Sequence, residues 1–328
     1  MKDWSRFIAE RPVTDGLPQS GFAVLESFGL IRVAGEDATT FLQGQLTGDV
    51  TQVTDHQGQL TAWCNPKGRM LAIFHLFRHQ DAYLLLLPRS RLPAILQRLQ
   101  MFVLRSKVDL AEVEGEVVTG LWGEACHERL PMLPDTPFGT RAMEGLTLMR
   151  LPGDPVRCQL VGPPQAQRAF FERYQEALPR ASEGAWALLD IRAGLPWIDD
   201  ATAEAFVPQM CNLDLLGGIS FTKGCYTGQE VVARMKYLGQ LKRRMYHAQV
   251  QASPCPKAGA ALFSPSSRSA QGAGKVVMAQ PAPQGGCEAL VVAEITAFEA
   301  GDLHLEGPDG PALTLQPPPY GLETEEEP

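Results

Sequence analysis

Short apolar runs rich in branched and aromatic residues dominate the N-terminal part of the chain and predict β-strands. They cover residues 22–25, 30–33, 60–64, 70–77 and 82–87. The tetrapeptide Asn65-Pro66-Lys67-Gly68 separates the third run from the fourth. Asparagine, proline and glycine at this spacing are typical of a tight turn, so these two runs are expected to form a hairpin.

Helical spacing replaces this pattern in two places. Between residues 91 and 104, apolar side chains recur every three or four positions, which predicts an amphipathic helix. A shorter helix is predicted at 185–193, where Gly194 and Pro196 would end it. Together with the strands, these helices predict an α+β fold for the larger, N-terminal part of the chain.

The pattern changes again after Gly239. Strand-like runs at 241–250, 275–278 and 290–295 are separated by loops rich in proline, serine and glycine. These short strands predict a small all-β domain at the C-terminus, built as a sandwich or a barrel. We therefore expect four parts: an N-terminal arm, an α+β region, a C-terminal β-domain and a disordered acidic tail, at residues 1–20, 21–240, 241–320 and 321–328.

The composition is that of an ordinary globular protein. The 328 residues exceed one average domain and predict two or three, and 45% of them are hydrophobic. The formal net charge of -8 gives no electrostatic reason for general binding to nucleic acids or membranes. Residues 1–10 lack the apolar core of a signal peptide, and the longest apolar run, 83–87, is far too short to span a bilayer.

Seven cysteines are spread widely along the chain, and none forms a Cys-x-x-Cys pair. An odd number at wide spacing argues against a disulfide framework, a preassembled zinc site or an iron–sulfur cluster. The six histidines show no metal-binding spacing. The chain also lacks a dinucleotide-binding glycine motif, a phosphate-binding loop, a nucleophile elbow and a zinc-protease motif. We therefore expect no bound metal and a reducing, cytoplasmic location.

One cysteine, Cys225, has neighbours that favour reactivity. Lys223 places a cation near it, and Thr227 and Glu230 have the spacing of a capping box that would begin a helix. The positive end of the helix dipole and the lysine would both favour a thiolate, the form that attacks, ligates or exchanges. The alternative interpretation is a buried cysteine that acts as a small hydrophobic residue.

The same region is locally basic. Six cations lie within residues 223–244, here called the basic segment, against the single acid Glu230. They are Lys223, Arg234, Lys236, Lys242, Arg243 and Arg244. In one interpretation, the basic segment is a solvated helix face followed by an edge strand whose Lys and Arg side chains prevent pairing with other strands. In the other, it is an anion site for a polycarboxylate tail, a phosphate or a short stretch of RNA.

These motifs resemble those of the YgfZ-type folate-binding proteins, which are relatives of the glycine-cleavage T-protein, an aminomethyltransferase. The most specific match is the octapeptide Lys223–Glu230, followed by Val232-Ala233-Arg234. Further matching blocks lie at residues 41–50, 67–70, 193–196 and 315–320. The resemblance therefore extends from about residue 22 to residue 320.

The resemblance implies a three-domain, ring-like α+β fold, with two interleaved subdomains in residues 21–240 and a C-terminal β-barrel. It also implies that tetrahydrofolate binds near the centre and that the protein helps to make or maintain iron–sulfur enzymes, including tRNA-modifying ones. The functional cysteine falls on Cys225, with Lys223 beside it, and folate-contacting aromatic residues fall on Phe28 and Trp186. The other candidate folate contacts are Tyr226, Gln229, Glu230 and Arg234.

Two positions depart from the family pattern. T-protein relatives carry carboxylates after the hairpin glycine, where this chain has Arg69-Met70-Leu71-Ala72. A positioned carboxylate is needed to poise the reacting nitrogens, so its absence argues against aminomethyl transfer. Relatives often carry glutamate where this chain has Arg192, and arginine cannot accept the N–H donors of a pterin amidine edge. Either Asp190 or another acid substitutes, or pterin binding is weaker or differently arranged.

The leading hypothesis is a tetrahydrofolate-binding accessory protein for iron–sulfur client enzymes that acts through Cys225. The basic segment would hold the glutamyl tail of the folate. A first alternative is a folate-dependent aminomethyl or methyl transferase. The sequence therefore does not decide whether the protein is an enzyme. A second alternative is an RNA-binding module built on the basic segment, which we favour less. No membrane partner is expected.

Overall fold

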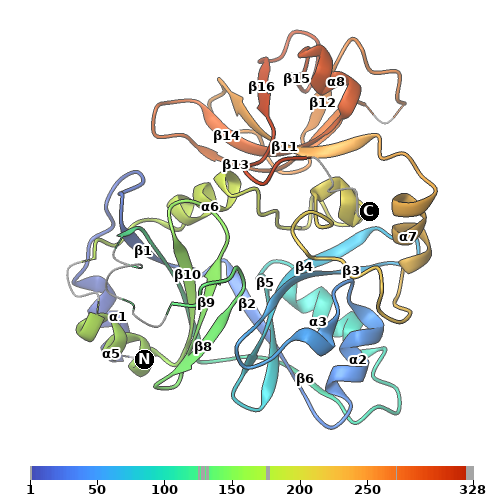
Figure 1. Cartoon of the computed structure of the whole chain (residues 1–328). Helices are drawn as coiled ribbons and strands as arrows, with labels where there is room; N and C mark the ends of the chain where they lie inside the picture. The colour runs from blue at the N-terminus through green and yellow to red at the C-terminus, as the bar shows by residue number, and fades with distance from the viewer. Residues whose placement is uncertain are drawn as a thin grey trace. The chain divides into compact units, whose positions relative to one another are not determined.

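The computed structural model describes residues 2–124, 126, 130, 133–174, 178–270 and 272–322. The chain divides into two compact units, each built from segments that are separated in the sequence. The first unit contains Met1–Leu42, Val50–Leu60 and Phe74–Trp186, and the second contains Gln43–Asp49, Thr61–Ile73 and Ala187–Pro328. Figure 1 shows the order of the elements along the chain.

One five-stranded antiparallel sheet of the first unit has the order β1-β7-β10-β9-β8. Its strands are β1 (Gly21–Val24), β7 (Val117–Trp122), β8 (Thr140–Met143), β9 (Leu146–Leu151) and β10 (Arg157–Gly162). Two helices, α1 (Lys2–Ala9) and α5 (Pro164–Tyr174), contribute aromatic side chains to the hydrophobic core that forms on this sheet.

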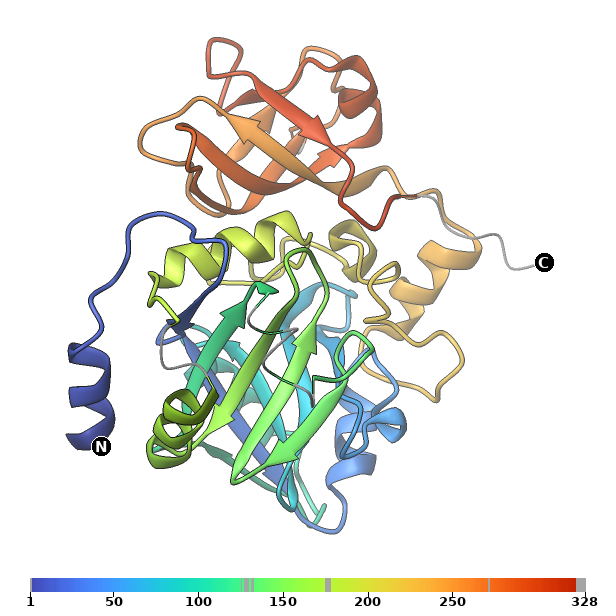
Figure 2. The same cartoon turned by 60° about the vertical axis from the view of Figure 1, so that its left-hand side comes forward.

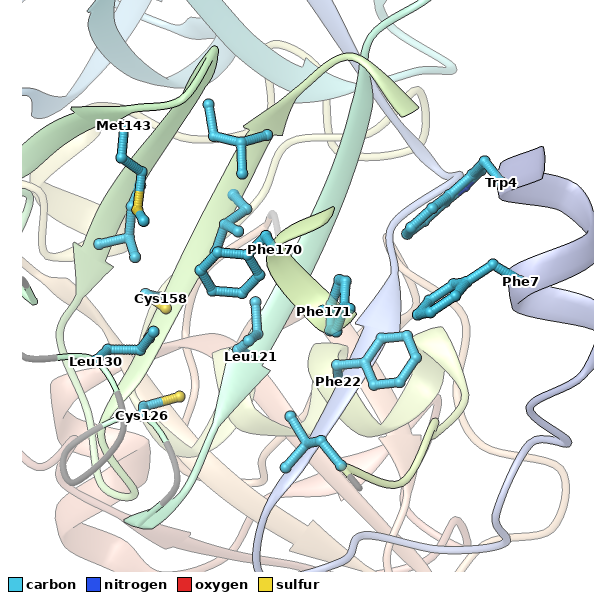
Figure 3. Packing of buried hydrophobic residues seen from close by; sticks show 14 residues of the cluster. Trp4, Phe7, Phe22, Leu121, Cys126, Leu130, Met143, Cys158, Phe170 and Phe171 are labelled. Carbon is cyan, nitrogen blue, oxygen red and sulfur yellow. The ribbon is translucent and has the colours of Figure 1, made fainter. Parts of the chain in front are cut away.

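Phe171 of α5 lies among the aromatic side chains of this core (Figure 3). Its ring centroid is 4.5 Å from that of Phe22 in β1, 5.9 Å from that of Phe7 and 6.1 Å from that of Trp4. Buried aromatic rings remove large apolar areas from water, so these contacts hold α1 to the sheet. The N-terminal part of the predicted arm is thus a packed helix.

A second five-stranded sheet has the order β3-β4-β5-β2-β6. Its strands are β2 (Phe28–Ala34), β3 (Gln59–Cys64), β4 (Met70–His79), β5 (Ala82–Pro88) and β6 (Asp109–Glu112). The hairpin predicted between β3 and β4 is confirmed. The N–H of Asn65 donates to the carbonyl of Arg69 at 2.8 Å, and the N–H of Gly68 donates to the carbonyl of Asn65 at 2.9 Å.

The helical elements next to this sheet in the sequence are α2 (Ala38–Gln45), the 3-10 turn η1 (Val50–Gln52) and α3 (Leu92–Gln100). Helix α3 ends earlier than the predicted residue 104. Met101, Phe102 and Leu104 are exposed, and Leu104 has a left-handed φ of 47°. Apolar spacing therefore continues into the turn without burial, which is why the pattern overestimated the helix.

The second unit contains most of α6 (Glu183–Arg192), the 3-10 turn η2 (Pro208–Cys211), α7 (Gln229–Tyr237) and a six-stranded antiparallel sheet. The sheet has the order β15-β12-β13-β14-β11-β16, and Figure 2 shows it curled, in orange and red. Its elements are β11 (Arg243–Val250), β12 (Ala261–Phe263), β13 (Gly274–Pro281), β14 (Cys287–Glu294), α8 (Ile295–Ala300), β15 (His304–Leu305) and β16 (Leu313–Gln316). The predicted β-rich C-terminal region is confirmed.

A disulfide joins Cys255 to Cys287, although 32 residues separate them in the sequence. The cysteine spacing argued against a disulfide framework and did not predict this bond. Strands β11 and β14 are antiparallel, and Val250 at the end of β11 is the partner of Cys287. The loop that follows β11 can therefore bring Cys255 to the start of β14, with a Cα–Cα distance of 5.7 Å.

None of the helices in the described ranges is long and apolar enough to cross a lipid bilayer. Within the same ranges, no group of three or more histidine, cysteine, aspartate or glutamate side chains is arranged to hold a metal ion. From residue 323 onward, the predicted acidic tail lies outside the described residues.

Candidate functional site

Residues 221–227, here called the thiol loop, carry the candidate cysteine and are tied at both ends to another segment of the second unit. The N–H of Ser220 donates to the carbonyl of Thr47 at 2.9 Å. The N–H of Thr227 donates to the carbonyl of Gly44 at 3.4 Å. The loop is therefore anchored on both sides of the thiol.

Lys223 adds a third anchor from inside the thiol loop. Its Nζ donates to the carbonyls of Leu46 and Gly48, at 2.8 Å each, and lies 5.1 Å from the centroid of the Tyr226 ring. Burial lowers the pKa of Lys223 to about 8, and the negative charge of Asp49 opposes this shift. The amine thus links the loop to the neighbouring backbone, and its effect on the thiol stays a prediction.

Cys225 is exposed, whereas the other free cysteines among the described residues are buried. These are Cys64, Cys126, Cys158 and Cys211. Burial raises the pKa of Cys64 to about 12 and also raises that of Cys211, so both thiols stay protonated at neutral pH. The interpretation as a buried hydrophobic residue is therefore wrong for Cys225, whose thiol is accessible to a reaction partner.

Helix α7 begins directly after the thiol loop, at Gln229. Its N-cap is Gly228, which has a left-handed φ of 86° and makes no side-chain cap. The capping box predicted for Thr227 and Glu230 is therefore wrong, because the helix begins one residue later than that motif requires. The backbone conformation at this start favours glycine, since other residues rarely adopt a positive φ.

The hairpin turn packs closely against this helix start. A Cβ at Gly228 would lie 2.6 Å from the carbonyl oxygen of Asn65, and a Cβ at Gly68 would lie 2.8 Å from the Cβ of Val231. Both distances are too short for real side chains, so each glycine permits a close approach of the two backbones. The turn between β3 and β4 and the start of α7 thus pack together as one structural block.

The other candidate contacts near the cysteine lie in the thiol loop and in α7. Tyr226 is buried, and burial raises its pKa. Gln229 is half-buried and Glu230 is exposed, both in the first turn of α7, with Arg234 exposed further along the helix. These four residues follow Cys225 in the thiol loop and in α7, and their proposed roles toward a folate stay predictions.

The basic segment divides into paired and exposed cations. Arg244 makes a two-point ion pair with Asp214, at 2.7 and 2.9 Å, and Arg243 donates to Glu294 at 3.2 Å. The exposed members are Arg234, Lys236 and Lys242. Because Arg243 and Arg244 neutralise acids of their own unit, the segment offers fewer cations to an anionic ligand than its sequence suggests.

The two predicted folate-contacting aromatic residues have different surroundings. Phe28, at the start of β2, lines a cavity of about 290 Å³ within the first unit. Trp186 does not line that cavity and is only 1% exposed. Its ring packs so closely on Gly120 of β7 that a Cβ there would lie 2.3 Å away, and the Arg157 guanidinium lies 5.1 Å from the ring centroid.

A carboxylate that no sequence pattern marks, Glu116, lines the same cavity as Phe28. It precedes β7 in the run Glu114-Gly115-Glu116, whose composition is typical of a surface turn. Neither spacing nor a motif distinguishes it from the exposed Glu114, since its position on a cavity results only from the packing of elements far apart in the chain.

Arg192, at the end of α6, makes a two-point ion pair with Glu288, at 2.6 and 3.0 Å. Burial raises the pKa of Glu288, but hydrogen bonds from His247 and Arg192 outweigh this effect and lower the pKa to about 2. Asp190 is buried and accepts the indole N–H of Trp197 at 2.9 Å. Neither Asp190 nor the acid that pairs with Arg192 is therefore an open carboxylate for a pterin.

No protein-family profile matches the chain, but curated relatives match almost its full length. The tRNA-modifying protein YgfZ of Photorhabdus laumondii is 33% identical over 324 residues, which cover 97% of this chain and 98% of that protein. The proteins of the same name from Enterobacter sp. (strain 638) and Pectobacterium carotovorum are 34% and 32% identical. Their alignments cover 97% and 96% of this chain, and 98% and 96% of the relatives.

Among solved structures, the glycine cleavage system aminomethyltransferase T of Bartonella henselae is similar to this chain. The TM-score is 0.67 at 17% sequence identity, and the alignment covers 93% of this chain and 87% of that one. This likeness shows the fold alone. The predicted aminomethyltransferase-type α+β fold is therefore confirmed.

Proposed function

This chain belongs to the YgfZ family of tRNA-modifying proteins, and we propose that it is a tetrahydrofolate-binding accessory protein for iron–sulfur enzymes. Its clients would include enzymes that modify tRNA. In this proposal Cys225 supplies the reactive thiol, and the folate binds to residues that the family resemblance identifies.

The exposure of Cys225 on an anchored loop supports the proposal most directly. Functional side chains work best when their supporting backbone is held in one arrangement. Here the loop is fixed by its two backbone hydrogen bonds and by the two carbonyl contacts of Lys223. The thiol is thus both accessible and positioned, as maintenance or exchange chemistry on a client protein requires.

The hairpin supports an accessory role over aminomethyl transfer. Met70 and Leu71, which follow the turn, are buried apolar side chains, and the Arg69 side chain donates to a backbone carbonyl. The carboxylate of Glu204 does reach this turn, but it accepts a hydrogen bond from the Asn65 side chain at 3.1 Å. A transferase would need a carboxylate directed at the reacting nitrogens.

Anaerobic calorimetric titration with tetrahydrofolate tests the ligand. We expect saturable binding to the wild-type protein. Absence of heat and of any shift in melting temperature at high ligand concentration would contradict the folate proposal, because a ligand that binds the native state raises its stability.

Replacing Cys225 by alanine tests the thiol. We expect most of the activity of iron–sulfur tRNA-modifying enzymes to be lost in cells that depend on this protein. The stability of the variant should stay within about 0.5 kcal/mol of wild type, because the side chain is exposed.

The matched control is Thr222→Ala, an exposed position in the same thiol loop. It should retain full activity in the same cells. Equal activity of Cys225→Ala and wild type would refute the role of the thiol.

A further inference from the structure

The disulfide of the C-terminal sheet joins a partly exposed cysteine to a buried one. Cys255 is half-buried in residues 251–259, here called the bridge loop, whereas Cys287 at the start of β14 is only 2% exposed. A dissolved thiolate can therefore approach the sulfur of Cys255 but not that of Cys287. Lys257 is exposed in the same loop, and its positive charge favours the approach of an anion.

Breaking this bond would free the bridge loop without separating the strands that it joins. Strands β11 and β14 are paired along their whole length, up to Val250 and Cys287. At the other end of the loop, the N–H of Gly259 donates to the carbonyl of Val276 at 2.8 Å. The two sulfurs would thus remain near each other after cleavage, so the same bond could form again.

A low-molecular-weight thiol such as glutathione supplies the chemistry for this cleavage. Its thiolate attacks the sulfur of Cys255, forms a mixed disulfide there and releases Cys287 as a thiolate, which takes up a proton. A second small thiolate attacks its counterpart in the mixed disulfide, which releases Cys255 and a small-molecule disulfide. Two electrons thus pass to the protein, and the small-molecule disulfide is the oxidant in the reverse direction.

The bridge loop packs against residues 199–206 of the same unit. Gly259 has a left-handed φ of 83°, and a Cβ there would lie 3.1 Å from the carbonyl oxygen of Ala201. The N–H of Ala201 donates to Oδ1 of Asp199 at 2.9 Å, which holds this residue in a turn. A shift of the bridge loop therefore changes the packing of residues 199–206.

Residues 199–206 are in turn bonded to the hairpin between β3 and β4. The N–H of Glu204 donates to the carbonyl of Met70, and the N–H of Met70 donates to the carbonyl of Phe206, at 2.8 Å each. The Asn65 side chain donates to the Glu204 carboxylate at 3.1 Å. The position of the hairpin turn thus depends on these residues.

The hairpin turn completes the connection to the reactive thiol. The carbonyl oxygen of Asn65 lies so close to Gly228 that a Cβ there would be 2.6 Å away. Gly228 is the N-cap of α7, and Cys225 lies three positions before it. All these contacts lie within the second unit. A continuous series of packed contacts couples two sites when an element in it has two states, which here are the oxidised and the reduced disulfide.

We propose that the Cys255–Cys287 disulfide is a reversible redox site for small-molecule thiols, and that its state sets the reactivity of Cys225. With the bond intact, the bridge loop keeps residues 199–206, the hairpin turn and the start of α7 in one packed arrangement. With the bond broken, the thiol loop gains conformations and Cys225 reacts faster. The inference goes beyond the proposed function and does not depend on it, because thiol reactivity is measured without folate or a client protein.

The rate of Cys225 alkylation, followed on its own peptide by mass spectrometry, tests the connection. We compare oxidised wild type with Cys255→Ser/Cys287→Ser and with Gly259→Ala. The last variant keeps the disulfide but adds a Cβ at 3.1 Å from the carbonyl oxygen of Ala201. Both variants should alkylate Cys225 about two- to fivefold faster than wild type, because local opening gives the reagent more access.

Gly301→Ala is the matched control for Gly259→Ala. Gly301 also has a left-handed φ, of 67°, but nothing lies within 4 Å of a Cβ there. The variant should carry a similar backbone penalty and alkylate Cys225 at the wild-type rate. Equal rates in oxidised wild type and the double-serine variant would refute the connection. An equal acceleration in Gly301→Ala would also refute it, because general loss of stability would then explain the effect.

Equilibration of native wild type with mixtures of reduced and oxidised glutathione tests the redox site itself. Peptide mass spectrometry reports the fraction of Cys255–Cys287 bonds at each ratio. We expect the bond to be reduced in excess reduced glutathione and to form again when oxidised glutathione is added. A bond that stays intact until the protein unfolds would overturn the redox site. Neither readout involves tetrahydrofolate, so a failure of this inference is distinguishable from a failure of the proposed function.

Discussion

At the scale of single residues, several charged side chains have partners that the local sequence does not reveal. Lys223 is two positions from Cys225 in the sequence, yet its amine donates to carbonyls of residues 46 and 48. Arg192 pairs with Glu288, which is far away in the chain. Charged residues near a motif therefore indicate a charged local environment, but the fold determines which group each charged side chain binds.

Stability should depend on pH through Lys223. Its pKa is lowered from 10.5 to about 8, so between these values the unfolded chain binds a proton that the folded chain does not. Stability rises with pH wherever the unfolded state binds more protons. The stability of wild type relative to Lys223→Met should therefore be constant below pH 8 and increase from about 8 to 10.5.

Urea unfolding of both proteins across this pH range provides the measurement. Lys236→Met is the control, since Lys236 is an exposed lysine of the same basic segment. This variant retains Lys223 and should therefore show the rise in stability with pH that wild type shows. A difference for Lys223→Met that stays flat or falls as the pH rises would contradict the burial argument.

At the scale of elements, local sequence located the strands and helices better than their ends. The hairpin turn at 65–68 is confirmed because asparagine, proline and glycine satisfy a turn without outside help. The end of α3 and the cap of α7 were wrong because burial and close packing decide them. In particular, the N-cap of α7 is Gly228 and not Thr227, and the hairpin turn packs against Gly228.

Substitution by alanine should affect stability very differently at two glycines near Cys225. Gly228 has a φ of 86°, and a Cβ there would lie 2.6 Å from a carbonyl oxygen, whereas nothing lies within 4 Å of a Cβ at Gly224. We expect Gly228→Ala to lower the free energy of unfolding by roughly 2–4 kcal/mol. Gly224→Ala should change it by less than about 0.5 kcal/mol.

Urea denaturation of the two alanine variants measures this contrast. The rate of Cys225 alkylation in native protein should also change more in Gly228→Ala than in Gly224→Ala, because the thiol loop precedes the displaced helix start. Equal stability losses in the two variants would show that the turn and α7 are not packed as described.

At the scale of the whole molecule, each of the two units draws on separated parts of the chain. Such units do not correspond to single stretches of sequence, because each combines three segments of the chain. The C-terminal sheet is an exception, because its six strands come from one continuous stretch of the sequence.

Reducing the disulfide should destabilise this C-terminal sheet. The bond closes a loop between residues 32 apart, and a cross-link of that length contributes about 3–4 kcal/mol by restricting the unfolded chain. Thermal unfolding with and without dithiothreitol provides the measurement. The double variant Cys255→Ser/Cys287→Ser should already be destabilised and should not respond to the reductant. A wild-type protein that is insensitive to reduction would contradict this expectation.

The sequence by itself determined the class of fold, the β3–β4 turn, the β-rich C-terminus and the family, because these depend on periodicity, turn chemistry and motifs that are local in the chain. Tertiary structure alone decided which thiol is exposed, which acids and bases pair, and that Glu116 lies on the cavity beside Phe28. The physical reason is that burial, pairing and desolvation are set by neighbours far away in the sequence.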